Sequence, residues 1–143
     1  MGRIIKHAIV IITLVSLCIA CCDKGDIQVD DEGRLVAKWH LERVTGGLHG
    51  NGYNPGFEYL EFLNDHFCQW YGADNEILAA GRYEIRSLDM GEYTGLIHFK
   101  VSQDSLINHF VKIDKKYRFE GRDTLLMDEG CCDLFSYVFS RVP

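Results

Sequence analysis

Short stretches in which apolar and polar residues alternate make up most of this chain, and any fold for it must accommodate them. In residues 93–101, YTGLIHFKV, one strand face would carry Ile97, Phe99 and Val101, and the other His98 and Lys100. A period of two places one face of a strand in a core and the other in water. Gly, Asn and Asp interrupt the pattern roughly every eight to twelve residues, which is typical of antiparallel all-β sandwiches and barrels.

The alternation predicts eight or nine strands. They span residues 35–44, 57–63, 67–72, 79–87, 93–101, 107–113, 116–121, 124–128 and 134–142. Residues 104–110, DSLINHF, are the place where a single helical turn is an alternative. Closing such a sheet removes its exposed edges and leaves an interior that is either packed or holds one small ligand. We therefore predict a single antiparallel all-β barrel domain over residues 34–143.

The first 20 residues differ from the rest of the chain. Arg3 and Lys6 precede 13 uncharged residues, 8–20, a stretch too short for a lone membrane-spanning helix, which needs about 20 residues. A basic start, an apolar middle and a small final residue are typical of a secretory signal peptide. Cys21 follows directly, and the sequence then becomes polar. This junction resembles the lipobox of bacterial lipoproteins, in which a cysteine becomes the lipid-modified first residue of the mature protein.

The lipobox resemblance implies a diacylglycerol on Cys21. Cys22 is a rival acceptor, and an ordinary signal peptide or an uncleaved anchor are further alternatives. Two or three acyl chains hold a protein firmly to a membrane, because each buried methylene contributes about 0.8 kcal/mol. Residues 21–33 would then form the lipidated N-terminus and a flexible, acidic tether. Removal of residues 1–20 takes away two basic residues and no acidic one, which changes the formal charge from −6 to −8 and disfavours nucleic acid as a partner.

Five segments, in their order along residues 35–142, resemble the small lipocalin-like lipoproteins of Bacteroidetes. They are AKWHL (37–41), YLEF (59–62), GRYEI (81–85), DTLLMD (123–128) and DLFSYVFSRV (133–142). Ala37 stands where lipocalins usually have glycine. The resemblance implies a lipocalin-like barrel whose floor is closed by Trp39 with Arg141 stacked over it, and an outer-membrane location on the periplasmic or cell-surface face. The triplets DSL and DTL resemble the O-glycosylation motif of Bacteroidetes, with Ser105 and Thr124 as candidate sites.

Three cysteines lie within the predicted domain: Cys68, Cys131 and Cys132. Disulfides are permitted outside the cytoplasm, and a bond from Cys68 to either of the other two would contribute on the order of 4 kcal/mol. Free buried thiols are the alternative. A zinc site that includes His66 is disfavoured, because adjacent residues of an extended chain point in opposite directions and both Cys131 and Cys132 would have to reach the ion. We expect no metal and no cofactor.

Aromatic side chains are the candidate ligand contacts, because pockets for small molecules are often lined by rings with a few polar groups. The predicted lining residues are Tyr83, Phe99, Tyr117, Phe119 and Tyr137. The sequence contains no HExxH, GxSxG or P-loop motif, and its glycine-rich residues 46–56 are interpreted as a lid loop because a strand follows them.

These features together predict a lipid-anchored envelope protein that binds a small apolar or amphipathic ligand without catalysis. One alternative is a filled barrel that serves as a structural or protein-binding module of the envelope. The other is an enzyme on the same fold.

Overall fold

The computed structural model describes residues 28–47, 53–88, 91–102, 107–130 and 135–143. Residues Gly33–Pro143 form one compact unit. The elements of the described residues are α2 (Gln28–Leu35), β1 (Lys38–Gly46), β2 (Tyr59–Leu63), the 3-10 turn η1 (Asn64–His66), β3 (Phe67–Tyr71), β4 (Ile77–Arg86), β5 (Gly95–Val101), α3 (Asn108–Lys112), β6 (Lys115–Glu120), β7 (Thr124–Asp128) and β8 (Phe135–Arg141).

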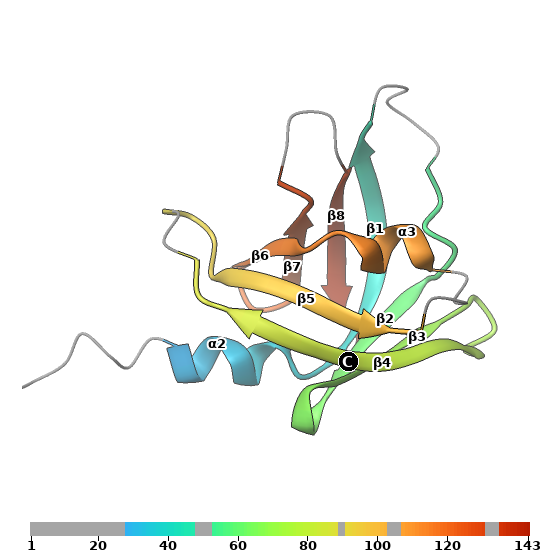
Figure 1. Cartoon of the computed structure of the whole chain (residues 1–143), viewed down its shortest axis with the longest axis horizontal. Coiled ribbons are helices and arrows are strands. Elements are labelled where there is room, and N and C mark those ends of the chain that lie inside the picture. Colours follow the sequence, from blue (N-terminus) through green and yellow to red (C-terminus); the bar gives the residue numbers. More distant parts are fainter. Residues whose placement is uncertain (1–27, 48–52, 89–90, 103–106, 131–134) are drawn as a thin grey trace, which may run out of the picture. The chain divides into compact units, whose positions relative to one another are not determined.

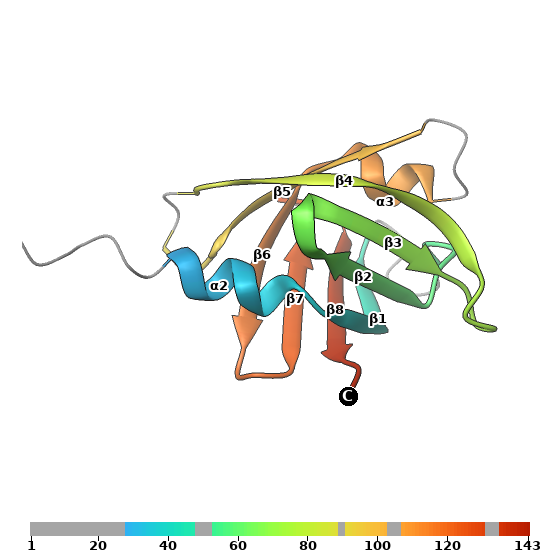
Figure 2. The same ribbon diagram turned by 90° about the horizontal axis from the view of Figure 1, so that it is seen from below.

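The eight strands form a closed barrel in which each strand pairs with the next and β8 returns to β1. All neighbouring pairs are antiparallel. Figures 1 and 2 show β1, β7 and β8 side by side, with β4 and β5 crossing them at a steep angle. The prediction of a single antiparallel all-β barrel is confirmed.

The interior of the barrel is filled by side chains that alternate along the strands. In β8 the inward residues Tyr137 and Phe139 are fully buried, while their neighbours are half-buried. Phe99 of β5 belongs to this core, with its ring centroid 5.3 Å from that of Trp70 and 5.5 Å from that of Phe110. Burying each large apolar side chain contributes about 1.5–3 kcal/mol, so this packing of rings is a main source of the stability of the barrel.

The strand predicted for residues 107–113 is wrong, because residues Asn108–Lys112 form helix α3. Strand periodicity would place His109 on the same face as Ile107. In the helix, Phe110 follows Ile107 by three residues, so both side chains reach the core, and both are buried. His109 stays exposed. The alternative prediction of a helical turn within residues 104–110 is therefore confirmed for residues 108–110, the first part of α3.

The last part of the predicted tether, residues 28–33, belongs to helix α2. Acidic residues lie in the first half of this helix and Arg34 lies in its last turn. This order of charges favours a helix, since it complements the helix dipole. Leu35 ends α2 and is fully buried, which fixes that end of the helix to the barrel unit.

Candidate functional site

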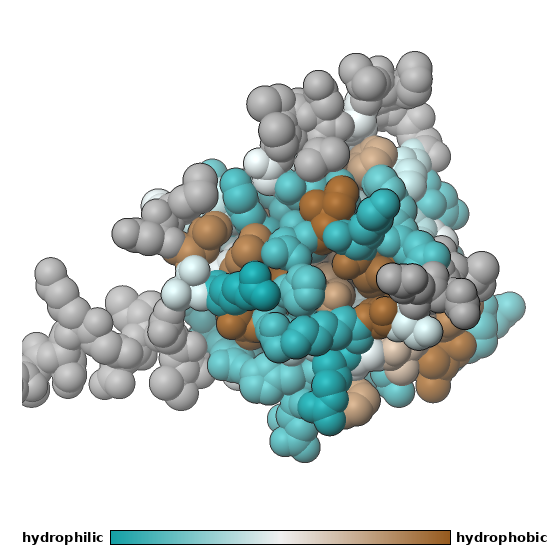
Figure 3. Space-filling model, in the orientation of Figure 1, coloured by the Kyte–Doolittle hydropathy of each residue, from teal (hydrophilic) through white to brown (hydrophobic). Residues whose placement is uncertain are grey.

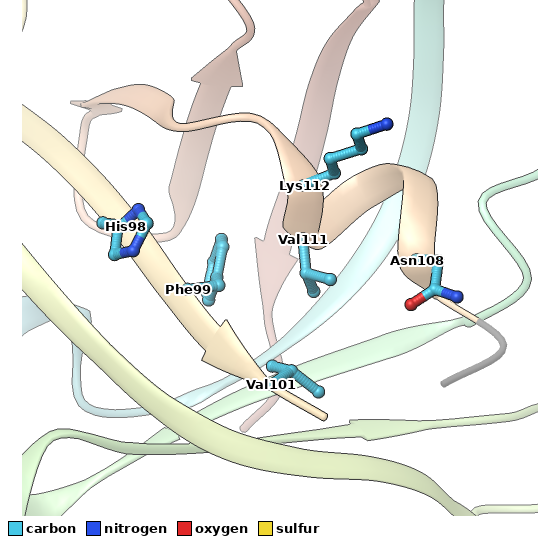
Figure 4. Close-up of a pocket in the computed structure, with 6 residues that line it drawn as sticks. All are labelled: His98, Phe99, Val101, Asn108, Val111 and Lys112. Atoms are coloured by element: carbon cyan, nitrogen blue, oxygen red, sulfur yellow. The ribbon is translucent and has the colours of Figure 1, made fainter. Parts of the chain in front are cut away.

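The wall of the barrel is interrupted beside β5, and this interruption forms the candidate site. β6 pairs with β5 only along residues 95–97. In the described part of the chain, no strand continues this pairing along residues 98–101, and α3 packs there instead (Figure 4). The space between them has a volume of about 520 Å³. We call it the β5–α3 slot; its lining residues are His98, Phe99, Val101, Asn108, Val111 and Lys112.

One face of helix α3 forms one wall of the slot. Asn108, Val111 and Lys112 are three and four residues apart, a spacing that places side chains next to one another on a helix. Figure 4 shows Val111 pointing toward Phe99 and Val101 of β5, while the Lys112 side chain extends away from them. Phe110 is buried in the core instead. The short helix therefore closes the barrel with one face and lines the slot with another.

The slot is polar at one end and more apolar at the other. His98 lies at one end of the β5 segment that lines the slot and Val101 at the other, and the Lys112 side chain extends away from His98 (Figure 4). His98 Nδ1 lies 2.6 Å from Asp114 Oδ1, and both side chains are 35% exposed. A carboxylate at Nδ1 orients the imidazole and leaves Nε2 available to another partner. Lys112 has no ion-pair partner within the described residues.

The inner surface of the slot is apolar. Phe99, Val101 and Val111 line it, and Phe99 is buried. Behind Phe99 lies Trp70, whose buried indole N–H has no acceptor within the described residues. Most buried polar groups in proteins are hydrogen-bonded, so this donor stands out from the apolar packing around it.

A buried ion pair lies next to α3, on the core side of this helix. Lys115 Nζ is 3.2 Å from Glu129 Oε1, and both side chains are 0% exposed. The Tyr137 hydroxyl donates a hydrogen bond to Glu129 Oε1 at 2.7 Å. Burial lowers the pKa of Lys115 to about 8, although the charge of Glu129 acts in the opposite direction. Burial and the hydrogen bond to Glu129 raise the pKa of Tyr137 above its usual range.

Lys115 connects this ion pair to helix α3. Its ammonium group donates to the carbonyl oxygens of Phe110 and, at 2.7 Å, of Ile113. These carbonyls lie at the C-terminal end of α3, where a helix leaves carbonyl groups without partners. Lys115 therefore holds the helix that forms one wall of the slot.

The structure does not arrange the five predicted ligand-lining residues around one cavity. Phe99 alone among them lines the slot. Tyr83, Tyr117 and Tyr137 are buried in the core. Phe119 is half-buried, with its ring centroid 6.0 Å from that of Trp39. These residues pack the barrel because they lie at inward positions of β4, β5, β6 and β8.

Trp39 and Arg141 meet at the other end of the barrel. They are paired across β1 and β8, and the Arg141 guanidinium lies 5.4 Å from the centroid of the Trp39 ring. The Trp39 indole N–H donates to Leu35 O at 2.9 Å, and Arg141 Nη2–H donates to Arg34 O at 2.8 Å. The pair thus fixes the last residues of α2 to this end.

Cys68 is a free, buried thiol, as in the free-thiol alternative. Burial raises its pKa above the usual range, so it stays protonated. It follows the β2–β3 turn, at the end of the barrel where β1 begins. Asp128 and Phe135, which flank the connection carrying Cys131 and Cys132, lie at the opposite end.

The remaining predictions concern a glycosylation site at Thr124, a metal site, and residues outside the described part of the chain. Thr124 is half-buried at the first position of β7. Within the described residues, no group of three histidine, cysteine or acidic side chains is placed to hold a metal ion. The predicted sites that lie outside the described residues are Cys21, Cys22, Ser105, Cys131 and Cys132.

The slot and the buried ion pair were not found from the sequence. The alternation of Tyr117 and Phe119, continued backward, places Lys115 on the inward face, and the alternation of Leu125 and Met127, continued forward, does the same for Glu129. Two opposite charges at inward positions of neighbouring strands were the available signal. The slot gave no such signal, because it depends on where the pairing of β5 with β6 stops.

The fold defines the class of this protein as a closed, eight-stranded antiparallel β-barrel with a short helix set into its wall. The chain matches no protein-family model, no curated protein and no solved structure. In the part of the chain that the structure describes, no helix has the length and apolar character needed to span a membrane.

Proposed function

We propose that this chain is a lipid-anchored protein of the cell envelope whose lipocalin-like barrel binds a small amphipathic molecule in the β5–α3 slot, without catalysing a reaction. One observation carries the binding proposal: a volume of about 520 Å³ combines an apolar inner surface with polar side chains at its rim. Pockets for small molecules usually measure about 300–1,000 Å³ and have this composition. The anchor is supported by the sequence around Cys21.

The placement of the perturbed ionisable groups supports binding over catalysis. Strongly shifted pKa values often mark catalytic sites when the groups face a cleft. Here the pKa of Lys115 is lowered and that of Tyr137 is raised, but both side chains are fully buried. Neither lines the slot. Their contacts hold α3 in place, which is a structural role.

The filled interior favours one alternative, a structural or protein-binding module of the envelope. Such a module would need an apolar surface for its partner. Figure 3 shows apolar residues in separate groups among hydrophilic ones on the face that it presents. The large apolar side chains that the described residues expose are Phe67, at 39%, and Ile77, at 59%. The slot is therefore the better-supported site.

Titration with 1-octanol tests the binding proposal. The full chain is placed in lipid nanodiscs, and the valine methyl signals are followed by NMR. We expect the methyl signals of Val101 and Val111 to shift with a saturable dependence on octanol. The Val111→Phe variant fills the slot with an apolar ring, so in identical nanodiscs its Val101 signals should not saturate, and it measures partitioning of the probe into the lipid. Equal responses of the two proteins would contradict the proposal.

The anchor is tested separately by mass spectrometry of the chain expressed in a bacterium that lipidates its own envelope proteins. We expect a mature N-terminus at Cys21 with the added mass of diacylglycerol. Cys21→Ala should abolish this modification, whereas Cys22→Ala should leave it intact. Unmodified sulfur at Cys21, or loss of the modification only in Cys22→Ala, would refute the assignment.

A further inference from the structure

We infer that the ligand of the β5–α3 slot is an N-acylated amino acid, whose amino-acid unit pairs with the open backbone edge of β5 at Phe99 and whose acyl chain lies against Val101 and Val111. This inference rests on the proposed function, and it adds the chemical class of the ligand. It follows from the direction of the backbone polar groups in the part of β5 that β6 leaves uncovered.

The slot lies along an edge of β5 and not over one of its faces. Its lining includes His98 from the outer face of the strand and Phe99 and Val101 from the inward face. Successive side chains of a strand point to opposite faces, so residues of both faces meet around one space at the strand edge. β4 pairs with the other edge along residues 96–101. The slot therefore borders the edge that β6 leaves after residue 97.

The backbone polar groups of Phe99 and Val101 point to this open edge. The carbonyl oxygen of Lys100 points to β4, because it lies 2.7 Å from the position that a Cβ on Gly81 would take. In an antiparallel ladder the backbone groups of successive residues point to opposite edges of the strand. Those of Phe99 and Val101 therefore point away from β4, and the described residues supply no backbone hydrogen-bond partner for them there.

An α-amino acid unit, –NH–CHR–CO–, complements the backbone of Phe99 at this edge. Two residues that form a hydrogen-bonded pair in an antiparallel ladder exchange both of their N–H···O=C bonds. The N–H and C=O groups of Phe99 thus fit the C=O and N–H groups of one such unit, in the way that free strand edges bind extended peptide groups. An ester has no donor, and an alcohol offers its donor and acceptor on one oxygen atom, so neither supplies the same pair.

The apolar part of the slot suits an acyl chain attached to this unit. Phe99, Val101 and Val111 supply the apolar lining, and Val111 points toward the other two (Figure 4). A longer peptide strand would place further backbone polar groups against these side chains without partners, which costs free energy. An acylated amino acid satisfies the short open edge and covers the apolar side chains, so the slot favours it over a peptide strand.

Lys115 holds the edge open before a ligand binds. Its ammonium group donates to the carbonyl oxygens of Phe110 and Ile113 and forms the buried ion pair with Glu129. These contacts keep α3 in the position where a strand would otherwise continue the ladder along residues 98–101. A ligand can therefore add to the edge without displacing a strand of the barrel.

Two probes that differ at a single position test the inference. They are N-octanoylglycine methylamide and its ester analogue, in which an oxygen atom replaces the glycine N–H group. Affinities are measured at pH 7 by the same NMR titration of the full chain in nanodiscs, with the Val111→Phe protein as the partitioning control. We expect the amide to bind about fivefold more tightly than the ester, because the ester cannot donate to the carbonyl oxygen of Phe99.

Amide hydrogen exchange in the same samples tests whether the probe binds at this edge. With the amide probe at saturation, we expect the exchange of the Phe99 N–H to slow about fivefold. The N–H groups of His98 and Lys100 are the matched controls, because they belong to residues that pair with β4 through their backbone. Their exchange rates should stay unchanged.

The outcomes separate the inference from the proposed function. Equal affinities of the amide and the ester, or unchanged exchange at Phe99 with the amide at saturation, would overturn the inference while the binding function stands. Acetyl-valyl-valine methylamide has a longer backbone and no acyl chain, and we expect it to bind more weakly than the octanoyl amide. Equal or tighter binding would identify a peptide strand as the ligand and overturn the inference. If no probe shifts the Val101 methyl signals differently from the Val111→Phe protein, the binding function itself is wrong.

Discussion

Replacing Lys115 with methionine tests whether the buried ion pair holds helix α3 to the barrel. Methionine has a similar length and no charge, so the change removes the ammonium group and little volume. Three interactions are lost: the ion pair to Glu129 at 3.2 Å and the hydrogen bonds to the carbonyl oxygens of Phe110 and Ile113. The Glu129 carboxylate then remains buried, with the hydroxyl of Tyr137 and the Phe135 N–H as its donors.

The expected loss follows from the burial of both groups. Removing one partner of a buried ion pair costs about 3–5 kcal/mol, because the other charge is left uncompensated. We therefore expect Lys115→Met to lower the free energy of unfolding by about 4 kcal/mol at pH 7. Adding Glu129→Gln removes the orphaned charge and keeps an acceptor for Tyr137. The double variant should then lose only about 2 kcal/mol, the cost of leaving the two α3 carbonyls without a donor.

The pKa of Lys115 adds a pH dependence of known sign. Burial lowers this pKa from 10.5 to about 8 in the folded chain. Below pH 8 both states hold the proton, and the full cost of burying the charge is present. Between pH 8 and 10.5 the folded state releases its proton first, so the stability of the wild-type chain should rise with pH.

We expect this rise to be about 1 kcal/mol from pH 7 to pH 9. Tyr137 acts in the opposite direction at higher pH, because its pKa is raised and the folded state retains its proton. The measurement should therefore stop near pH 9.

Denaturant unfolding followed by circular dichroism measures all of these quantities. The wild-type chain, both single variants and the double variant form a thermodynamic cycle at pH 7. The wild type and Lys115→Met are then compared at pH 7 and pH 9, and the rise should be absent in the variant. Single losses that add up in the double variant within about 0.5 kcal/mol would show that the two charges do not interact. The same rise with pH in both proteins would show that it comes from another group.

Four further substitutions, three in the barrel and one in helix α2, are tested by the same unfolding assay. Trp39→Ala should lower the free energy of unfolding by about 3–5 kcal/mol, because Trp39 is fully buried. Phe67→Ala should lower it by only about 1 kcal/mol, because that side chain is 39% exposed. Equal losses in the two variants would contradict the role of Trp39. Gly81→Ala should cost about 1–3 kcal/mol, because its Cβ would lie 2.7 Å from the carbonyl oxygen of Lys100. Gly33→Ala should raise the free energy of unfolding by about 0.5–1 kcal/mol, because Gly33 lies in helix α2 and the added Cβ would meet no neighbouring atom within 4 Å. A lower stability of this variant would contradict the assignment of a helix at Gly33.

The strands of the barrel could be predicted from the sequence because each of them has one buried face. Tyr137 and Phe139 in β8 are inward residues two apart, and this period is visible without knowledge of the partner strand. Helix α3 could not be predicted with the same ease. It has five residues, too few to show a helical period, and it forms because Phe110 reaches a core that the other strands have built. A contact of this kind is tertiary, so the local sequence does not specify it.

The departure of α3 from the strand pattern also explains why the slot lies in the wall of the barrel and not inside it. Continued pairing between β5 and β6 would have satisfied the backbone groups of residues 98–101 with ladder hydrogen bonds. The chain instead gives up that pairing and buries Lys115 against Glu129 to hold a one-turn helix in its place. Departures from local rules concentrate at functional sites, where shape is retained at a cost in stability. The interior is packed mainly with apolar side chains, and its buried ion pair is used to hold α3. We therefore expect a ligand of this barrel at the slot, where the pairing of β5 with β6 stops.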